Sequence, residues 1–211
     1  METELLAVFD DKLQKISENT REFIHKNGLW HETFHCWFVH IKEGVPYLYF
    51  QRRSEGKKDF PNLFDITAAG HILVHETVED GIREVKEELG IDICMNDLHA
   101  IGIIRDRILQ EAFMDNEFAH TYLYITENEN PPFHIQTEEL SGIFSSPLAE
   151  VEKLYKQEID HISVKCLISN KDDLAEIKIT LQDVVPHGIG YMSQVITSIQ
   201  QKLGELAIVK C

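Results

Sequence analysis

The 211-residue chain has few cysteines and no long apolar run. Its four cysteines are widely spaced and form no C-x-x-C pair, which predicts reduced thiols in a cytoplasmic protein. The apolar runs are far too short to span a bilayer. The first residues, Met-Glu-Thr-Glu, are acidic and lack the positively charged start of a signal peptide. We therefore expect no membrane association.

Basic residues are scarce as well. Lysine and arginine number 20 against 36 aspartates and glutamates, so the formal net charge is −16. Proteins that bind polymeric nucleic acid normally carry the opposite balance, so DNA or RNA is not an expected partner. A small phosphorylated substrate needs only local positive charge. One cluster could supply it, namely Arg52, Arg53, Lys57 and Lys58. A basic turn at the surface is the alternative interpretation.

The remaining composition is that of an ordinary soluble protein, with 43% hydrophobic and 27% charged residues. A chain of this length suits one domain with appendages. It can bury roughly 70% of its unfolded surface without a disulfide or metal staple. No internal repeat, low-complexity tract or clear linker interrupts it. We therefore expect a single domain over residues 1–211.

Local patterns predict a mixture of strands and helices. Alternating, β-prone segments predict strands at residues 4–9, 33–40, 46–52, 64–68, 98–107, 118–126 and 139–144, with 13–16 as a hairpin partner of the first. Helices are predicted at residues 20–25, 147–155, and from 188 or 192 to 206. Asp115-Asn116 predicts a turn, and residues 159–179 fit neither pattern clearly.

The segment from Glu76 to Gly90 predicts the central helix of the fold. At about 100° per residue, its apolar side chains form one core-facing stripe. The stripe consists of Val78, Ile82, Val85 and Leu89. Thr77 can cap the start, with Asp80 three residues later as in a capping box. Gly90 is suited to end the helix.

Three carboxylates, Glu84, Glu87 and Glu88, fall together on the opposite face of this helix. Close pairs of like charge on a helix repel by a few tenths of a kcal/mol each. A hard divalent cation offsets that repulsion, because Mg²⁺ and Mn²⁺ prefer oxygen ligands. A solvated acidic face is the alternative for such a pattern taken alone.

The surroundings of these carboxylates resemble the Nudix box, G-x5-E-x7-R-E-U-x-E-E-x-G-U, in which U is aliphatic. The matching residues are Gly70, Glu76, Arg83, Glu84, Val85, Glu87, Glu88, Gly90 and Ile91. One departure is plain, because six residues rather than seven separate Glu76 from Arg83. The carboxylate face is unaffected, but the pairing of Glu76 with Arg83 is in question.

The resemblance to Nudix hydrolases implies an α/β (α+β) fold. The expected architecture is a three-layer α/β/α sandwich around a mixed β-sheet. Its core would cover residues 31–160, with an N-terminal β/helix lead-in and a C-terminal helical extension. Dimers are common among such relatives, so a homodimer is left open beside a monomer.

Further segments look like one Nudix branch, type I isopentenyl-diphosphate isomerase. These segments are 27–35, 52–65, Ala69-Gly70-His71 and 115–118. In the isomerases, metal is bound by the residues that match His35, His71, Glu88, Asp115 and Glu117. The isomerases also carry a cysteine that transfers protons, and this chain has Ala69 at that position.

Ala69 favours hydrolysis over isomerisation. An isomerase needs two groups that add and remove protons on opposite faces of the allyl unit, and alanine cannot titrate. We therefore expect metal-dependent cleavage of a diphosphate bond in a small nucleoside-linked or other X-linked diphosphate. The expected cofactor is Mg²⁺ or Mn²⁺. The alternatives are an isopentenyl-diphosphate isomerase-like enzyme and a non-catalytic regulator that binds a phosphorylated metabolite.

These expectations assign roles to individual residues. The predicted metal ligands are Glu84, Glu87, Glu88, His35 and His71. Glu117 is a candidate catalytic carboxylate, with Glu138 or Glu139 as further candidates for accepting a proton from water. The predicted contacts to the substrate are Arg52, Lys58 and Gly70.

Overall fold

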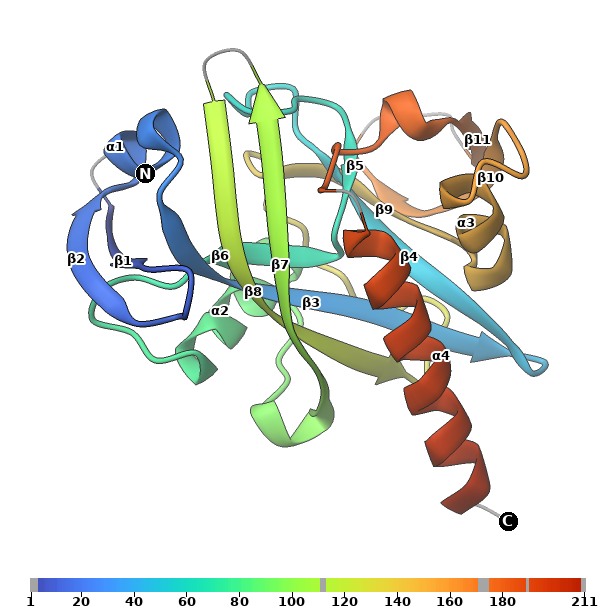
Figure 1. Cartoon of the computed structure of the whole chain (residues 1–211). Helices are drawn as coiled ribbons and strands as arrows, with labels where there is room; N and C mark the ends of the chain where they lie inside the picture. The colour runs from blue at the N-terminus through green and yellow to red at the C-terminus, as the bar shows by residue number, and fades with distance from the viewer. Residues whose placement is uncertain (1–3, 111–112, 171–174, 189, 210–211) are drawn as a thin grey trace.

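The computed structural model describes residues 4–110, 113–170, 175–188 and 190–209 (Figure 1). Its strands are β1 (Leu5–Phe9), β2 (Lys15–Thr20), β3 (Trp30–Lys42), β4 (Val45–Arg53), β5 (Phe64–Asp65), β6 (Ala68–His71), β7 (Leu98–Gln110), β8 (Phe113–Thr126), β9 (Leu140–Pro147), β10 (Ile162–Ser169) and β11 (Glu176–Ile179). Its α-helices are α1 (Arg21–Asn27), α2 (Arg83–Leu89), α3 (Leu148–Tyr155) and α4 (Tyr191–Val209). The 3₁₀ helices are η1 (Glu79–Ile82), η2 (Met95–Asp97) and η3 (Leu181–Asp183).

Strand β3 is the centre of the sheet. It runs parallel to β8 from the pair Trp30–Asn116 to the pair His40–Thr126. Its other edge pairs antiparallel with β4, but only from Val39 to Lys42. Most other pairs are antiparallel, including β7 with β8 and β9 with β4 and β10. The sheet is therefore mixed, as predicted.

Strands β3 and β4 separate where their pairing ends. Beyond that point the short strand β6 takes the free edge of β3, and β5 pairs with the end of β4. The separation leaves a space that backbone does not fill and that residues of β3, β4, β5 and β6 line. The cavity described below lies there.

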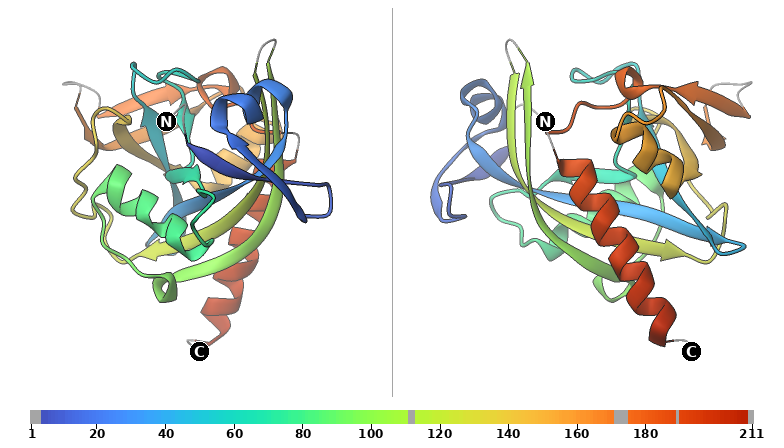
Figure 2. Two further views of the ribbon diagram at one scale, coloured as in Figure 1. Left: turned by 90° about the vertical axis from the view of Figure 1, so that its left-hand side faces the viewer. Right: turned by 45° about the vertical axis from the view of Figure 1, so that its right-hand side comes forward.

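Helices cover both faces of the sheet. Trp37 and Val39 of β3 pack in a core that includes α3 and α4, whereas Phe34 and Phe38 pack in a second core that includes α2. This alternation is the period-2 pattern of a strand buried on both faces. Figure 2 shows α2 and α4 on opposite sides of the sheet. The predicted three-layer arrangement is confirmed.

The apolar stripe of the central helix is confirmed as well. Val85 and Leu89 are fully buried, and Val78 and Ile82 pack against the same core. Gly90 ends α2 with a φ of 69°, a left-handed conformation that favours glycine. The start of the helix differs from the predicted one at Thr77, because residues 79–82 form the 3₁₀ turn η1 and α2 begins only at Arg83. Asp80 accepts hydrogen bonds from the backbone N–H and hydroxyl of Thr77.

Most predicted strands and helices are present, although their ends differ from the predicted bounds. Three regions differ from the prediction in kind. The turn predicted at Asp115-Asn116 is wrong, because both residues lie inside β8 and pair with β7. Polar side chains suggested a turn there, but they face other elements, and Asn116 donates to the carbonyl of Gly28. The strand predicted over 64–68 is split into β5 and β6, and the undecided region 159–179 contains β10 and β11.

No helix in the described ranges is long and apolar enough to cross a membrane.

Candidate active site and metal centre

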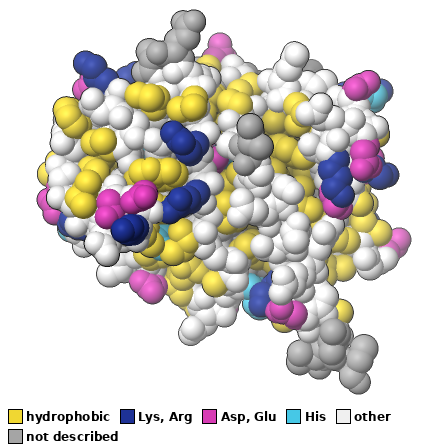
Figure 3. Space-filling view, viewed as in Figure 1, with side chains coloured by type: hydrophobic (Ala, Val, Ile, Leu, Met, Phe, Trp, Pro, Cys, Tyr) yellow, Lys and Arg dark blue, Asp and Glu magenta, His cyan; other side chains and the backbone are white. Residues whose placement is uncertain are grey.

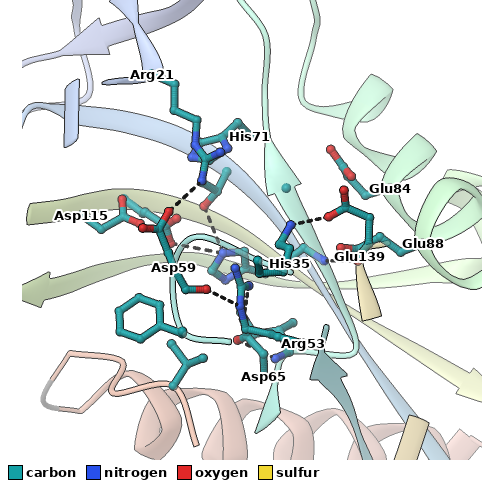
Figure 4. Close-up of a pocket in the computed structure, with 18 of the residues that line it drawn as sticks. Arg21, His35, Arg53, Asp59, Asp65, His71, Glu84, Glu88, Asp115 and Glu139 are labelled. Carbon is teal, nitrogen blue, oxygen red and sulfur yellow. Dashed lines mark hydrogen bonds and ion pairs between the residues drawn. The ribbon is translucent and has the colours of Figure 1, made fainter. Parts of the chain in front are cut away.

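A cavity of about 540 Å³ opens where β3 and β4 separate. Its walls come from α1, β3, β4, β5, β6, α2 and the β7–β8 hairpin, and from the segment that precedes α4. Figure 4 shows Glu84 and Glu88 on one side of this space and Asp115 on the other. Residues far apart in the chain therefore meet at one site.

Arg83 organises the acidic side of the cavity. Its Nε and one Nη donate to both oxygens of Glu76, at 2.6 and 3.1 Å. The guanidinium also pairs with Glu84 and Glu87. The pairing of Glu76 with Arg83 is therefore made despite the short spacing. A 3₁₀ helix rises about 2.0 Å per residue against 1.5 Å in an α-helix, so the η1 turn spans the distance with fewer residues.

Gly70 makes room for Glu84. A Cβ atom at Gly70 would lie 2.1 Å from Oε1 of Glu84 and 2.2 Å from its Cδ. Such distances are far below van der Waals contact, so any side chain at this position displaces the carboxylate. The predicted role of Gly70 in contacting substrate is untested, and its observed contact is with this glutamate.

Two of the box carboxylates are in an environment that disfavours negative charge. Burial raises the pKa of Glu84 to about 7, against the opposing effect of Arg83. Burial and then the charge of Glu84 raise the pKa of Glu88 well above its usual range. Gln51 and the backbone N–H of Ala69 both donate to Oε2 of Glu88, at 3.2 and 3.1 Å. Glu87 differs, because its side chain is 54% exposed.

Three histidines meet at one place, and His71 among them lines the cavity. His25 comes from α1, His31 from β3 and His71 from β6, and one ring nitrogen of each lies within 4.8 Å of the others. His31 also lies within the same distance of carboxylate oxygens of Asp115 and Glu117. Within the described residues these are the two groups with metal-ligand geometry. We call these five residues the histidine–carboxylate cluster.

Two atoms of this cluster are buried without a hydrogen-bond partner, Nε2 of His31 and Oδ1 of Asp115. They lie 3.4 Å apart. The Nδ1 of His31 lies 3.2 Å from the carbonyl of Leu29, which can only accept, so Nδ1 carries the proton and Nε2 presents its lone pair. A buried acceptor with no donor is costly. A metal ion between these atoms would satisfy both.

The protonation of the histidines fits metal binding. Burial lowers the pKa of His25 to about 3 and that of His31 to about 4. Burial also holds the pKa of His71 well below 6.5. Metal ligation requires neutral imidazole. The donor set of imidazoles and carboxylates therefore suits a divalent ion.

His35, predicted as a ligand, lies beside the cluster but in neither group. Its Nδ1 hydrogen-bonds to the hydroxyl of Tyr191 at 2.8 Å, and its Nε2 lies 3.2 Å from Oε2 of Glu117. The Nε2 also lies 3.2 Å from the hydroxyl of Thr33. His31, four residues earlier on the same face of β3, is instead a member of both groups.

The basic residues at the cavity also differ from those predicted. Arg53 and Lys57 line the cavity, and Lys57 pairs with Glu139. Arg52 is not among the lining residues, since it donates to the carbonyl of Asn62 and stacks on Phe64. Lys58 and Glu138 are not lining residues either. On the face shown in Figure 3, lysine and arginine side chains form separate small groups beside acidic ones.

A family model of the NUDIX domain matches residues 30–166. The chain belongs to the Nudix hydrolase family. It is 36% identical over 203 residues to an uncharacterized Nudix hydrolase of Clostridium acetobutylicum, an alignment that covers 94% of this chain and 98% of the relative. Nudix hydrolases act in general on nucleoside diphosphate-linked substrates and use divalent metal ions. The resemblance to the isomerase branch is not confirmed by these matches.

Solved structures agree on the Nudix fold. A Deinococcus radiodurans protein, DR0079, matches with a TM-score of 0.55 and 16% identity, over 74% of this chain and 89% of that protein. A MutT/nudix family protein of Enterococcus faecalis matches with a TM-score of 0.51 and 13% identity, over 90% of this chain and 66% of that protein. At these identities the likeness concerns the fold alone.

Sequence reasoning missed His25, and from the basic cluster it selected Arg52 and Lys58 rather than Arg53 and Lys57. The basic cluster was recognised, but not which of its side chains turn inward. Residues at i and i+2 of a strand share a face, so the alternation of β3 groups His31 with His35, and the resemblance to the isomerases favoured His35 as the ligand. The position of His25 depends on the packing of α1 beside β8, for which the sequence carries no signal that we can name.

Substituting Gly70 tests the geometry at Glu84. We expect Gly70→Ala to lower kcat/KM by about 10²-fold, because a displacement of order 1 Å at a reacting group can cost that much. Gly204→Ala, on α4, is the matched control, since a Cβ there meets nothing within 4 Å. Activity and melting temperature are measured together. Full activity in folded Gly70→Ala would contradict this account of the glycine.

Proposed function

We propose that this chain is a metal-dependent hydrolase that cleaves the diphosphate bond of a small nucleoside-linked or other X-linked diphosphate in the cavity described above. One observation carries the proposal. Asp115 lines the same cavity as the box carboxylates, Arg53 and Lys57, and its unpartnered Oδ1 lies 3.4 Å from the unpartnered Nε2 of His31. Binding of a phosphorylated metabolite alone would not need that many metal-type donors.

Two donor sets are available for metal. Glu84, Glu87 and Glu88 offer only oxygen, which suits Mg²⁺ or Mn²⁺, although they do not form one of the two groups with metal-ligand geometry among the described residues. The histidine–carboxylate cluster offers nitrogen and oxygen, which suits a first-row transition ion better than Mg²⁺. When bound, such ions lower the pKa of a water molecule and offset charge that develops on phosphorus.

The chain's own groups supply binding and proton transfer. Arg53 and Lys57 hold the phosphates through charge-assisted hydrogen bonds. Of the carboxylates predicted to accept a proton, Glu117 belongs to the histidine–carboxylate cluster, and Glu138 does not line the cavity. We therefore assign the acceptor role to Glu139, which lines the cavity beside Lys57.

The proposed contacts of Arg53 and Lys57 with phosphate predict the KM of alanine variants. Arg53→Ala and Lys57→Ala should each raise KM about 10-fold or more, because hydrogen bonds to charged groups are worth roughly 1.5–3 kcal/mol. Arg52→Ala removes the same charge one residue away but outside the cavity lining, so its KM should stay within about 2-fold of wild type. Steady-state kinetics at fixed ionic strength measures all three. A larger effect of Arg52→Ala than of Arg53→Ala would return the role to the residue first predicted.

A panel of diphosphate-linked metabolites tests the function itself. We expect phosphate or phosphomonoester release from at least one compound with Mg²⁺ or Mn²⁺, and none with EDTA. Tight binding of a metabolite without turnover would instead assign a regulator.

An isopentenyl-diphosphate isomerase-like enzyme is the second candidate, because His71, Asp115 and Glu117 gather as metal-type ligands in the cluster. Ala69 stands against it, since this residue lines the cavity and supplies no proton. A homodimer and a cytoplasmic location stay predictions.

A further inference from the structure

The segment before α4 closes one wall of the cavity. Val184 forms a parallel bridge to Phe64, and the N–H of Val185 donates to the carbonyl of Phe64 at 2.9 Å. Val185 and His187 then line the cavity. This segment lies beyond residue 166, where the match to the NUDIX family model ends.

His187 is held between two buried carboxylates. Its Nδ1 lies 2.5 Å from Oδ2 of Asp106 on β7, and its Nε2 lies 3.0 Å from Oδ1 of Asp65 on β5. All three side chains are at most 8% exposed. Because both ring nitrogens face carboxylate oxygens, both must donate, and the ring is an imidazolium. Burial opposes this charge, but the two carboxylates outweigh it and raise the pKa of His187 to about 10.

The backbone beside His187 also contacts the carboxylate of Asp106. The N–H of Gly188 donates to Oδ1 of Asp106. A Cβ on Gly188 would lie 2.8 Å from the nitrogen of Arg107 and 2.9 Å from Oδ1 of Asp106. The ring of Tyr191 stacks on that of His187, with centroids 4.7 Å apart. The imidazolium therefore has one well-defined position.

The contact with Asp65 connects His187 to the cation at the cavity. The Oδ2 of Asp65 accepts from Nη1 of Arg53 at 2.9 Å, and Figure 4 shows this pair at the cavity. Arg53, Asp65, His187 and Asp106 thus form a row of alternating charges with no net charge. Without the imidazolium, the row would carry a net negative charge beside the site proposed for phosphate.

We propose that His187 is a positioning residue for the diphosphate of the substrate. It fixes Asp65, which in turn aims the guanidinium of Arg53 into the cavity, and it cancels one of the two carboxylate charges behind that guanidinium. This assignment rests on the proposed function, and it extends the substrate site into the C-terminal segment outside the family match.

A double-mutant cycle on binding of inorganic pyrophosphate tests the assignment without turnover. Calorimetry is carried out on wild type, His187→Gln, Arg53→Ala and the double variant. We expect His187→Gln to raise the Kd about 10-fold in the wild-type background and less than 2-fold in the Arg53→Ala background, because residues that act through one another are not additive. His161→Gln, at an exposed histidine just before β10, should leave the Kd unchanged.

Asp106→Asn is the second variant in case His187→Gln folds poorly, and it should raise the Kd in the same direction by a smaller factor. Equal fold-changes in both backgrounds, or no change on substituting His187, would overturn the assignment, as would a wild-type protein that binds no pyrophosphate. Failure of the proposed function is seen separately, as pyrophosphate binding by wild type with no turnover of any compound in the metabolite panel.

Discussion

Replacing Glu88 by glutamine is expected to lower kcat/KM by about 10²–10³-fold, as for loss of one group that stabilises charge in a transition state. Glu88 is 7% exposed, and burial and Glu84 disfavour its charge. A carboxylate in that position keeps its charge only if a cation offsets it. Glutamine retains the size and a carbonyl oxygen but removes the charge.

Metal binding by variants of the neighbouring glutamates tests the same role. Glu84→Gln and Glu87→Gln should also weaken Mn²⁺ binding in isothermal titration, whereas Glu79→Gln should not. Glu79 is exposed on η1 and does not line the cavity, so it controls for loss of one acidic charge on the same segment. Equal Mn²⁺ binding by wild type and all three cavity variants would show that the acidic face is only solvated.

Substitution of His31 is expected to have the second large effect. We expect His31→Leu to lower the affinity for Mn²⁺ at the histidine–carboxylate cluster by at least about 10²-fold, because changes around metal ligands typically cost 10–100-fold even outside the first coordination sphere. His31 is fully buried and its Nε2 lacks a partner. Leucine therefore removes the nitrogen that would bind the metal ion and leaves no unsatisfied nitrogen in its place.

Thermal unfolding separates ligand loss from misfolding in this variant. Metal that binds only the folded state stabilises by roughly 2.7 kcal/mol at one hundred times its Kd. Wild type and the exposed control His161→Gln should therefore melt at a higher temperature with Mn²⁺ than with EDTA. His31→Leu should show a smaller increase. An undiminished increase in folded His31→Leu would remove His31 from the ligand set.

The sequence predicted the parts of the site that are local in the chain. The face formed by Glu84, Glu87 and Glu88 depends on helix periodicity over five residues, and the stripe ending at Leu89 does too. Gly90 at the helix end follows from the same kind of short-range rule. These features need no knowledge of which strands are neighbours, so they could be placed from residue spacing.

The histidine–carboxylate cluster depends on long-range register instead. His31 and Glu117 are paired because β3 and β8 run parallel, although the two residues are 86 positions apart in the chain. A shift of one residue would turn every side chain to the other face. Asp115 was placed in a turn for the same reason, since nothing local shows that the β7–β8 hairpin extends past it. His187 depends on the return of the C-terminal segment to β5.

We propose that the reaction in this cavity is hydrolysis of a diphosphate bond and not isomerisation of an allylic one. It is tested most directly by following the metabolite panel, with isopentenyl diphosphate included, by ³¹P and proton NMR in D₂O with Mg²⁺ or Mn²⁺. We expect the anhydride phosphorus signals of at least one compound to give way to phosphomonoester or phosphate signals, and isopentenyl diphosphate to take up no deuterium. Deuterium entering C2 or C4 of isopentenyl diphosphate at enzymatic rates, with all anhydride signals intact, would contradict it.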